Sequence, residues 1–259
     1  MKQVCRSMLG QITRWAIMTL RGWVPEYREA ICRTPYHPYL YYNLGVLLHR
    51  INRKPEARTE YNLAIEAFEN QARIAAEHAT RFSEDGNTAE AQLSEQRRAT
   101  LLKNEAEPYN ALGALAQAEG RSAKARAAYE SAAAHNPDLL LAAYNLGILD
   151  AKKSPDKAIA LWRKVLAKDK DYLPAHQRLA ETWQRLGKFE ESATEYREVL
   201  RLEPDSSVAK AHLPEVLGDM NAARGNKSEA CNQYGLAEAA APENRRKIEK
   251  KKKRVCPGA

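Results

Sequence analysis

The first clue to the fold is the stretch YNALGALAQAEGRSAKARAAYESAAAHNP, residues 109–137. It contains a Leu-Gly pair at Leu112 and Gly113, a second glycine at Gly120, and an alanine-rich segment that ends at Pro137. Alanine and leucine favour helices, glycine commonly follows the end of a helix, and proline cannot continue one. The stretch therefore predicts two short helices that are separated near Gly120 and closed by Pro137.

Similar strings recur along the chain at a fixed interval. Asn-Leu-Gly or Ala-Leu-Gly ends at Gly45, Gly113 and Gly147. The separations, 113 − 45 = 68 and 147 − 113 = 34 residues, share one unit of 34, with a hidden copy between the first two. A fixed period of about 20–50 residues is the signature of repeat proteins, whose units are stable only when stacked on their neighbours. We therefore expect an array of helical hairpins.

This pattern resembles the tetratricopeptide repeat, in which an aromatic residue, a Leu-Gly pair, small residues, a second aromatic residue and a proline follow one another over about 34 residues. The resemblance extends to the superhelical repeats of O-linked GlcNAc transferase. It implies an all-α fold, a right-handed superhelical solenoid of about six to seven antiparallel helix pairs. The clearest copy carries the pattern on Tyr109, Leu112, Gly113, Gly120, Ala125, Tyr129, Ala132 and Pro137.

The copies in phase predict the boundaries of the units. The array is expected over residues 38–244, after a basic amphipathic N-terminal helix (1–25) and the second half of a degenerate first repeat (26–37), and before a basic C-terminal tail (245–259). The units within the array are expected at residues 38–71, 72–105, 106–139, 140–172, 173–206 and 211–244.

The unit 72–105 departs most from the pattern. It keeps only Ala79, Gly86 and Ala91, and it is highly charged. Two interpretations remain open: a degenerate repeat, or a long charged helical insertion. In the other units we interpret the small and aromatic residues as core. The small residue at the eighth position allows the helices to approach closely, and the later aromatic residue is expected to fill the space between adjacent pairs.

The net charge of +8 is concentrated at the two ends of the chain. The first 25 residues contribute +4, the tail contributes +7, and 8 − 4 − 7 leaves about −3 for residues 26–244. A near-neutral body argues against nucleic-acid binding along the whole groove. The tail is expected to begin as a short capping helix after Pro242 and to end in a solvated lysine run, or to anchor the chain to an anionic membrane surface or nucleic acid through Arg245, Arg246, Lys247, Lys250, Lys251, Lys252, Lys253 and Arg254.

The N-terminal helix leaves a similar choice open. It carries Val4, Met8, Ile12, Trp15 and Thr19 on one stripe. Such a helix either covers the first repeat as a cap or lies on a membrane surface. We expect a cytoplasmic location, with membrane association as the alternative.

No pattern of catalytic or metal-binding residues occurs. The four cysteines, Cys5, Cys32, Cys231 and Cys256, are widely scattered and lack metal-ligand spacing. They are interpreted as free thiols in a reducing compartment, without a disulfide framework. The histidines are spread over different units. We therefore expect no enzyme activity, no cofactor and no metal.

By resemblance to the family, the first helix of each pair lines a concave face that binds protein. Tyrosine offers contact area there, amides can pair with a peptide backbone, and arginine can hold a carboxylate. The candidates for peptide binding are Tyr42, Asn43, Asn110, Gln117, Tyr144, Asn145, Lys152, Gln177, Arg178 and Arg185.

Two binding modes of the family can be compared with these candidates. In the capture of a C-terminal carboxylate, Asn145 and Arg178 match, but both lysines of that mode are missing. In the asparagine ladder of the transferase superhelices, Asn43 and Asn145 match, and other residues interrupt the ladder. A groove that grips a peptide backbone less regularly is the preferred hypothesis.

The predicted function is a non-catalytic scaffold or adaptor that binds a protein or extended peptide. The alternative is peripheral binding to anionic surfaces through the basic ends.

Overall fold

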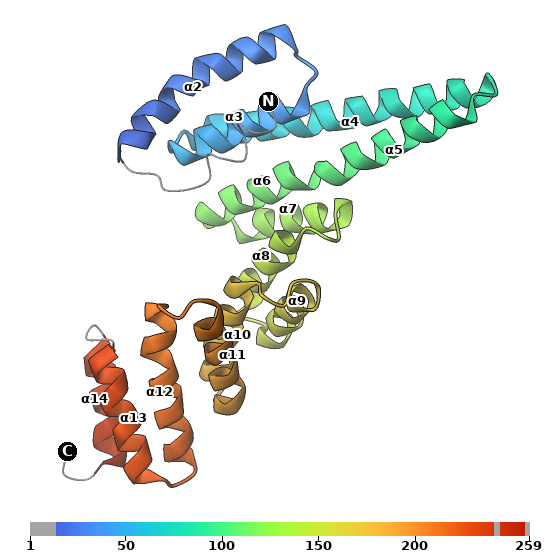
Figure 1. Cartoon of the computed structure of the whole chain (residues 1–259). Coiled ribbons are helices and arrows are strands. Elements are labelled where there is room, and N and C mark those ends of the chain that lie inside the picture. Colours follow the sequence, from blue (N-terminus) through green and yellow to red (C-terminus); the bar gives the residue numbers. More distant parts are fainter. Residues whose placement is uncertain (1–13, 241–243, 257–259) are drawn as a thin grey trace. The chain divides into compact units, whose positions relative to one another are not determined.

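The computed structural model describes residues 14–240 and 244–256, with side-chain exposure described from residue 21. Within this part of the chain every regular element is a helix (Figure 1). The all-α prediction is confirmed. The chain divides into two compact units, residues 1–142 and 143–259, and each is considered by itself. The predicted stripe of the N-terminal helix lies outside the described side chains.

The first unit is built from helices stacked on the pair α3–α4. Val24 of α2 is buried against Leu47 and Leu48 of α3, so α2 covers one side of this pair. Tyr27 packs into the same cluster. Helix α2 thus supplies the half repeat expected at residues 26–37, although it begins earlier. The helices of this unit are α2 (Arg14–Arg33), α3 (Pro38–Arg50), α4 (Lys54–Glu84), α5 (Thr88–Asn104), α6 (Ala106–Ala118) and α7 (Ser122–His135).

Helix α4 does not end at the predicted boundary between the repeats 38–71 and 72–105. It runs without a break from Lys54 to Glu84, through the end of one expected unit and into the next. The pattern's closing proline is missing here, and between Glu56 and Asp85 the chain has neither proline nor glycine, so nothing interrupts the helix. The continuation returns as α5 after a turn at Gly86, whose φ is +72°.

The end of α4 and α5 therefore form one antiparallel hairpin that extends beyond α3 and α6 (Figure 1). At its base, Phe68 and Leu101 are buried together, and Arg97 donates to Gln71 over 3.1 Å. We therefore propose that residues 72–105 are a charged helical insertion and not a degenerate repeat.

Helix α6 packs directly on the first half of α4, beside the inserted hairpin. Leu112 of α6 packs against the cluster that contains Ala57 and Tyr61 of α4. Arg58 of α4 also pairs with Glu119, at the end of α6, over 2.5 Å. The pairs that begin at residues 38 and 106 are therefore neighbours in space, although 68 residues separate them in the sequence.

The second unit continues with helix pairs of regular length. Helix α8 (Leu140–Asp150) crosses the division between the units. Between α11 and α12 the core contains Tyr196, Val199, Ala209 and Val216, all with at most 1% of their surface exposed. The remaining helices are α9 (Pro155–Lys168), α10 (Leu173–Arg185), α11 (Phe189–Leu202), α12 (Ser207–Ala223), α13 (Lys227–Ala240) and α14 (Arg245–Val255).

The glycine at the eighth position of a repeat lies in the first helix of a pair, against the aromatic ring of the second helix of the same pair. A Cβ atom added to Gly45 would stand 2.6 Å from Tyr61, and one added to Gly218 would stand 2.6 Å from Tyr234. The ring fills the space left by the missing glycine side chain, which allows the two helices of one pair to cross closely. It also packs against the next pair, as expected, because Tyr196 of α11 lies in one cluster with Ala209 and Val216 of α12.

The C-terminal residues differ from the prediction in two respects, because the helix expected after Pro242 continues through the lysine run and two cysteines are joined. Residues Arg245–Val255 form helix α14, packed on α13, with Ile248 only 1% exposed. In addition, Cys231 and Cys256 form a disulfide, although both were expected to be free thiols. The prediction failed because their separation of 25 residues follows no familiar cysteine spacing, whereas α14 folds back along α13 and brings them together.

Candidate functional site

The ten predicted binding residues fall into two groups, one in each compact unit. Tyr42, Asn43, Asn110 and Gln117 belong to α3 and α6 of the first unit. The others belong to α8 and α10, or to the turn after α8, in the second unit. These are Tyr144, Asn145, Lys152, Gln177, Arg178 and Arg185.

Most residues of the first group take part in the packing of the repeats. The Tyr42 ring lies 6.1 Å from that of Tyr61, and burial, followed by the carboxylate of Glu107, raises the pKa of Tyr42. Asn110 is 8% exposed. Gln117 accepts a hydrogen bond of 2.8 Å from the hydroxyl of Tyr129, in the second helix of its own pair. These contacts have a structural role, so the first group offers little surface to a partner.

The second group presents more of its side chains to solvent. The Nε of Arg178 donates to the hydroxyl of Tyr144 over 3.4 Å, and its Nη1 donates to Glu181 over 2.9 Å. The ring of Tyr144 meets that of Tyr172 edge to face, with the centroids 5.7 Å apart. The backbone is held as well, because Trp162 Nε1 donates to the carbonyl of Tyr144 over 3.1 Å. This part of α8 is therefore fixed from two sides.

Two arginines of α10 contact residues of α8, or of the turn after it, that lie one repeat length earlier in the sequence. Arg178 reaches Tyr144, and Arg185 donates to the carbonyl oxygen of Ala151. Each pair is separated by 34 residues, one repeat length. Arg178 therefore lies next to Tyr144, and Arg185 lies next to the backbone of Ala151. We call the six residues of the second group the α8–α10 face.

The α8–α10 face is positively charged. Lys152, Arg178 and Arg185 are exposed, and the nearby carboxylate of Glu181 pairs with Arg178. The hydrogen bond to Tyr144, followed by the charge of Glu181, raises the pKa of Arg178, so its guanidinium group remains charged at any physiological pH. Exposed guanidinium and ammonium groups beside tyrosine rings suit an acidic, extended segment of chain.

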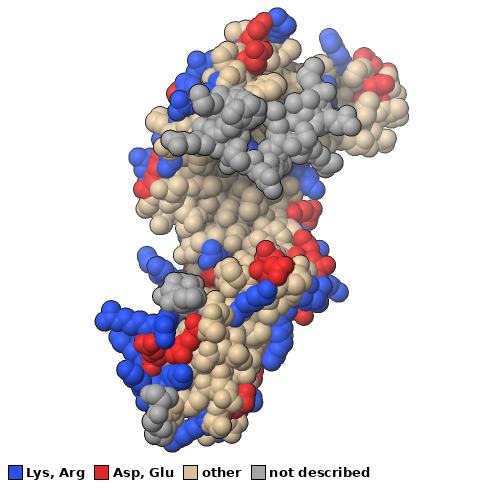
Figure 2. Space-filling model, turned by 60° about the vertical axis from the view of Figure 1, so that its left-hand side comes forward, with Lys and Arg blue, Asp and Glu red and all other residues tan. Residues whose placement is uncertain are grey.

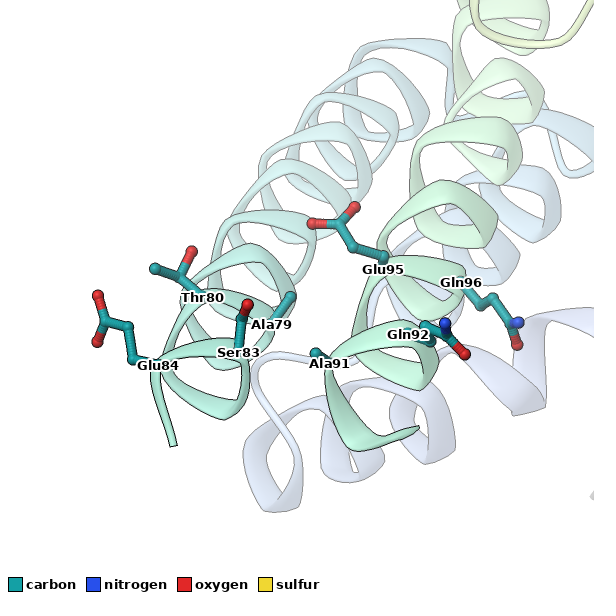
Figure 3. A pocket seen from close by; sticks show the side chains of 8 residues that line it. All are labelled: Ala79, Thr80, Ser83, Glu84, Ala91, Gln92, Glu95 and Gln96. Carbon is teal, nitrogen blue, oxygen red and sulfur yellow. The ribbon is translucent and has the colours of Figure 1, made fainter. Parts of the chain in front are cut away.

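Two hollows of the described surface lie in the first compact unit. One, of about 580 Å³, lies between the ends of α4 and α5 and includes Glu84 and Glu95. Figure 3 shows Glu84 projecting on the side of α4 away from α5, so the two carboxylates do not form a pair. A second, of about 410 Å³, lies between α4, α6 and α7. Among the described residues, no group of three His, Cys, Asp or Glu could hold a metal ion.

Charged side chains gather around the C-terminal helices. Figure 2 shows Lys and Arg side chains around a group of carboxylates at the lower left of the view, the region of α14. Lys251 contacts both Glu215 and Asp219 of α12, and Lys252 pairs with Glu238 of α13. Sequence reasoning missed these pairs because it treated the lysine run as a solvated tail. One signal was present: 211 + 34 = 245, so α14 begins where another repeat would begin.

No helix of the described residues is both long enough and apolar enough to cross a membrane.

Family models for the tetratricopeptide repeat match residues 24–72 and 149–213. Comparison with curated protein sequences gives no significant match. Among solved structures, the C-terminal part of a TPR repeat-containing protein from Cytophaga hutchinsonii is similar in fold, with a TM-score of 0.51 and 14% identity over 89% of this chain and 94% of that one.

Two further solved structures are similar over most of this chain. The pilus biogenesis factor PilW matches with a TM-score of 0.48 and 20% identity, over 82% of this chain and 98% of that chain. The APC/C hetero-tetramer Cut9-Hcn1 matches with a TM-score of 0.48 and 17% identity over 93% of this chain, which spans about half (48%) of the matched chain.

The resemblance to the transferase superhelices is minor, because Arg178 of α10 stands at the position where the ladder requires asparagine. The antiparallel pairs, the glycine–aromatic contacts and the 34-residue register agree with both family matches, and they identify this chain as a tetratricopeptide repeat protein.

Proposed function

We propose that this protein is a non-catalytic scaffold and that its α8–α10 face binds an extended, acidic segment of a partner protein. Tetratricopeptide repeat proteins are generally scaffolds for protein–protein interaction, which supports the broader part of the proposal. The assignment of the binding surface depends on two contacts, Arg178 with Tyr144 and Arg185 with Ala151, which have the same 34-residue spacing. These contacts support a binding surface that combines cations and a tyrosine from two consecutive repeats.

The charges of this face favour an acidic ligand. Arg178 and Arg185 each use some of their donors within the protein, and their side chains remain exposed. A guanidinium group has five N–H donors, so donors remain for a carboxylate of the ligand. Gln177 lies next to Arg178 on α10, and its amide group is suited to a peptide backbone. Asn145 lies next to Tyr144 on α8.

The alternative function, binding to anionic surfaces through the basic ends, has less support. Lys247, Lys251 and Lys252 of α14 already pair with carboxylates of α12 and α13. The charge available to a membrane or a nucleic acid is correspondingly smaller than the sequence suggests. We therefore retain the protein-binding scaffold as the proposed function.

The test compares binding before and after removal of the two arginines. The probes are a labelled extended peptide rich in glutamate and a second peptide in which lysine replaces each glutamate. The double variant Arg178→Ala, Arg185→Ala should bind the acidic peptide at least about tenfold more weakly, equivalent to about 1.4 kcal/mol. The lysine peptide should bind neither protein.

A matched control removes the same charge from another surface. Lys164 of α9 and Arg197 of α11 are exposed residues of second helices, and their double alanine variant should bind like the unchanged chain. Equal weakening by both double variants would show that net charge alone attracts the peptide, and would contradict the proposal. Crosslinking of the intact protein, followed by mass spectrometry, should place natural partners on α8 and α10.

A further inference from the structure

Helix α14 occupies the place of the first helix of another repeat. It begins at Arg245, 34 residues after Ala211, where the preceding unit was expected to start. Its single buried aliphatic residue, Ile248, packs with Ala230, Tyr234 and Ala237 of α13. In a stacked array this side of a pair is the surface that receives the next neighbour. Helix α14 thus covers a surface whose normal role is to bind a helix.

The covered surface is acidic, and three lysines neutralise it. Glu215 is 1% exposed and lies 2.8 Å from Lys247 and 2.7 Å from Lys251. Lys251 also lies 2.5 Å from Asp219, and Lys252 lies 3.1 Å from Glu238.

Burial by itself would raise the pKa of Glu215, but His212, Lys247 and Lys251 together hold it well below its ordinary value. The carboxylate is therefore charged at neutral pH. A carboxylate that is buried without a cation beside it is strongly unfavourable, so any helix that covers this surface must bring basic side chains.

A covalent bond holds the basic occupant in place. The disulfide joins Cys231 of α13 to Cys256, immediately after α14, with the Cα atoms 5.9 Å apart. Apart from Ile248 and the partly buried Val255, α14 has few apolar contacts, so ion pairs provide much of its remaining attachment. Ion pairs at a surface are weakened by salt, whereas a disulfide is not. The bond therefore determines whether α14 can leave.

We propose that α14 covers an acidic docking surface and that the disulfide acts as a redox-sensitive latch on this cover. The surface is formed by Glu215 and Asp219 of α12 and by Tyr234 and Glu238 of α13. Once uncovered, it receives a basic helix of a partner protein. A dithiol reductant opens the latch. It supplies two electrons and two protons, the bond between the sulfur atoms of Cys231 and Cys256 breaks, two thiols form, and the reductant becomes a disulfide.

Helix α14 itself indicates the chemistry of the partner. The partner must present three cations at the spacing of Lys247, Lys251 and Lys252, with one aliphatic residue next to the first of them. Positions i, i+4 and i+5 fall on one side of a helix. An anionic membrane or a nucleic acid would be repelled by the three carboxylates, so a basic helix is the occupant that fits.

The first experiment follows α14 in the full-length chain. The run of lysines and arginines makes it a good substrate for trypsin once it is undocked. In the oxidised chain, α14 should resist trypsin and exchange its amides slowly. With dithiothreitol or in the variant Cys231→Ser, cleavage within α14 should accelerate at least about tenfold at high salt, where the ion pairs are weak.

Matched controls separate the latch from general effects of reduction. Cys32 is an exposed free cysteine in α2, and Cys32→Ser should leave the protection of α14 unchanged. Thiol titration of the oxidised chain should find two reactive groups fewer than that of the reduced chain. Equal protection of α14 in the oxidised and reduced chains at every salt concentration, or no loss of thiols on oxidation, would overturn the proposal.

The second experiment asks whether the uncovered surface binds a helix in trans. The chain carrying Cys231→Ser, Lys247→Glu and Lys251→Glu repels its own α14, and circular dichroism checks that the other helices remain. A labelled synthetic peptide of residues 244–256, with Cys256→Ser, should bind this chain and not the oxidised natural one. A peptide with the same two lysines changed to glutamate should not bind.

A milder variant keeps the result interpretable if the triple variant loses its fold. The single variant Cys231→Ser, in reduced form at raised salt, should also bind the natural peptide, and Glu215→Gln added to it should weaken that binding. Absence of peptide binding to an uncovered, folded chain would overturn the proposal. This outcome is independent of the peptide bound at the α8–α10 face, so the two proposals can fail separately.

Discussion

Gly113 of α6 lies directly against the ring of Tyr129 in α7, so that a Cβ atom at position 113 would stand 2.5 Å from Cδ1 of that ring. The same relationship joins Gly45 to Tyr61 and Gly218 to Tyr234, each time across 16 residues. A Cβ contact below 3.0 Å is essentially never observed, so one of the two helices would have to move. The close crossing of each pair therefore depends on the absence of one side chain.

Replacing Gly113 with alanine should destabilise the first unit. Alanine favours a helix by about 0.5–1 kcal/mol over glycine, but overpacking a buried contact costs about 1–3 kcal/mol. The buried ring of Tyr129 has little room to turn away, so we expect a net loss of about 1–2 kcal/mol. Urea unfolding followed by circular dichroism measures the change.

Gly235 of α13 provides the matched control for this substitution. It also lies inside a helix, and a Cβ atom added to it would meet nothing within 4 Å. Gly235→Ala should therefore stabilise the protein, by about 0.5–1 kcal/mol. If both alanine variants shifted the unfolding midpoint in the same direction, the packing explanation for Gly113 would be wrong.

Gln117 should matter for stability, although its position in the repeat predicts a role in binding. Its side chain accepts the hydrogen bond of Tyr129, a buried tyrosine whose pKa is raised to about 12 by burial. Gln117→Ala leaves that hydroxyl without this acceptor and should cost about 1–3 kcal/mol. Combining it with Tyr129→Phe removes both partners, and the double variant should be less destabilised than the sum of the two single changes. Additive losses would contradict a direct interaction.

A pH-dependent contribution to stability is expected from His176. Its Nδ1 lies 2.6 Å from Glu195 Oε2 and its Nε2 lies 2.9 Å from the carbonyl oxygen of Lys170, so both ring nitrogens face acceptors. The hydrogen bond to Glu195, aided by the carbonyl of Lys170 and by the charge of Glu198, raises the pKa of His176 although burial opposes it. The protonated imidazole is therefore preferred in the folded chain.

The sign of the pH effect follows from this raised pKa. A group whose pKa is higher in the folded chain stabilises it fully below the unfolded pKa, about 6.5 for histidine, and this contribution is lost as the pH rises through the folded value. The free energy of unfolding should thus fall as the pH increases from about 6 toward 8. His176→Asn should flatten this part of the profile. An unchanged slope in the variant would assign the effect to another group.

The sequence predicts the structure well at positions that obey the 34-residue pattern, and poorly elsewhere. Gly45, Gly113, Gly147 and Gly218 recur at the eighth position, and each lies in the first helix of a pair. The boundary at residues 71 and 72 does not follow the period, because α4 runs through it. The position of the aromatic ring could not be derived in the same way, because spacing along the chain does not tell whether the contact at Tyr61 is made within a pair or between pairs. Only the crossing of α3 and α4 settles that.

The features that were missed arise from contacts between segments with no shared pattern. The disulfide between Cys231 and Cys256 requires α14 to fold back along α13. The period could have predicted a full helix beginning at Arg245, but the lysine run hid its extent, because like charges within a helix are unfavourable unless acidic neighbours compensate them. Two of those neighbours, Glu215 and Asp219, lie more than 30 residues before the lysines that they contact. The predicted binding residues also differ from one another in the structure. Arg178 is exposed on the α8–α10 face, whereas Gln117 accepts a hydrogen bond from the buried Tyr129.

The hairpin formed by the end of α4 and by α5 should be removable without loss of the repeats on either side. Gln71 and Arg97 lie next to each other at 3.1 Å, so a short glycine-rich loop can replace residues 73–96 with little closure cost. Because Leu112 of α6 packs directly against the cluster around Tyr61, the stacking of α6 on α4 does not pass through the hairpin. We expect circular dichroism to show fewer helical residues, and the urea midpoint of the remaining protein to stay nearly unchanged.

Phe68 sets the inner limit of what can be removed. It is 1% exposed and packs with Ala72 and Leu101 at the base of the hairpin, where Tyr39 of α3 joins them. Phe68→Ala should therefore cost about 3–5 kcal/mol, in contrast to the nearly neutral excision. If residues 72–105 were instead a repeat that carries the stacking between its neighbours, the excision would unfold the first unit at least as strongly as Phe68→Ala. The order of these two effects thus distinguishes an insertion from a repeat.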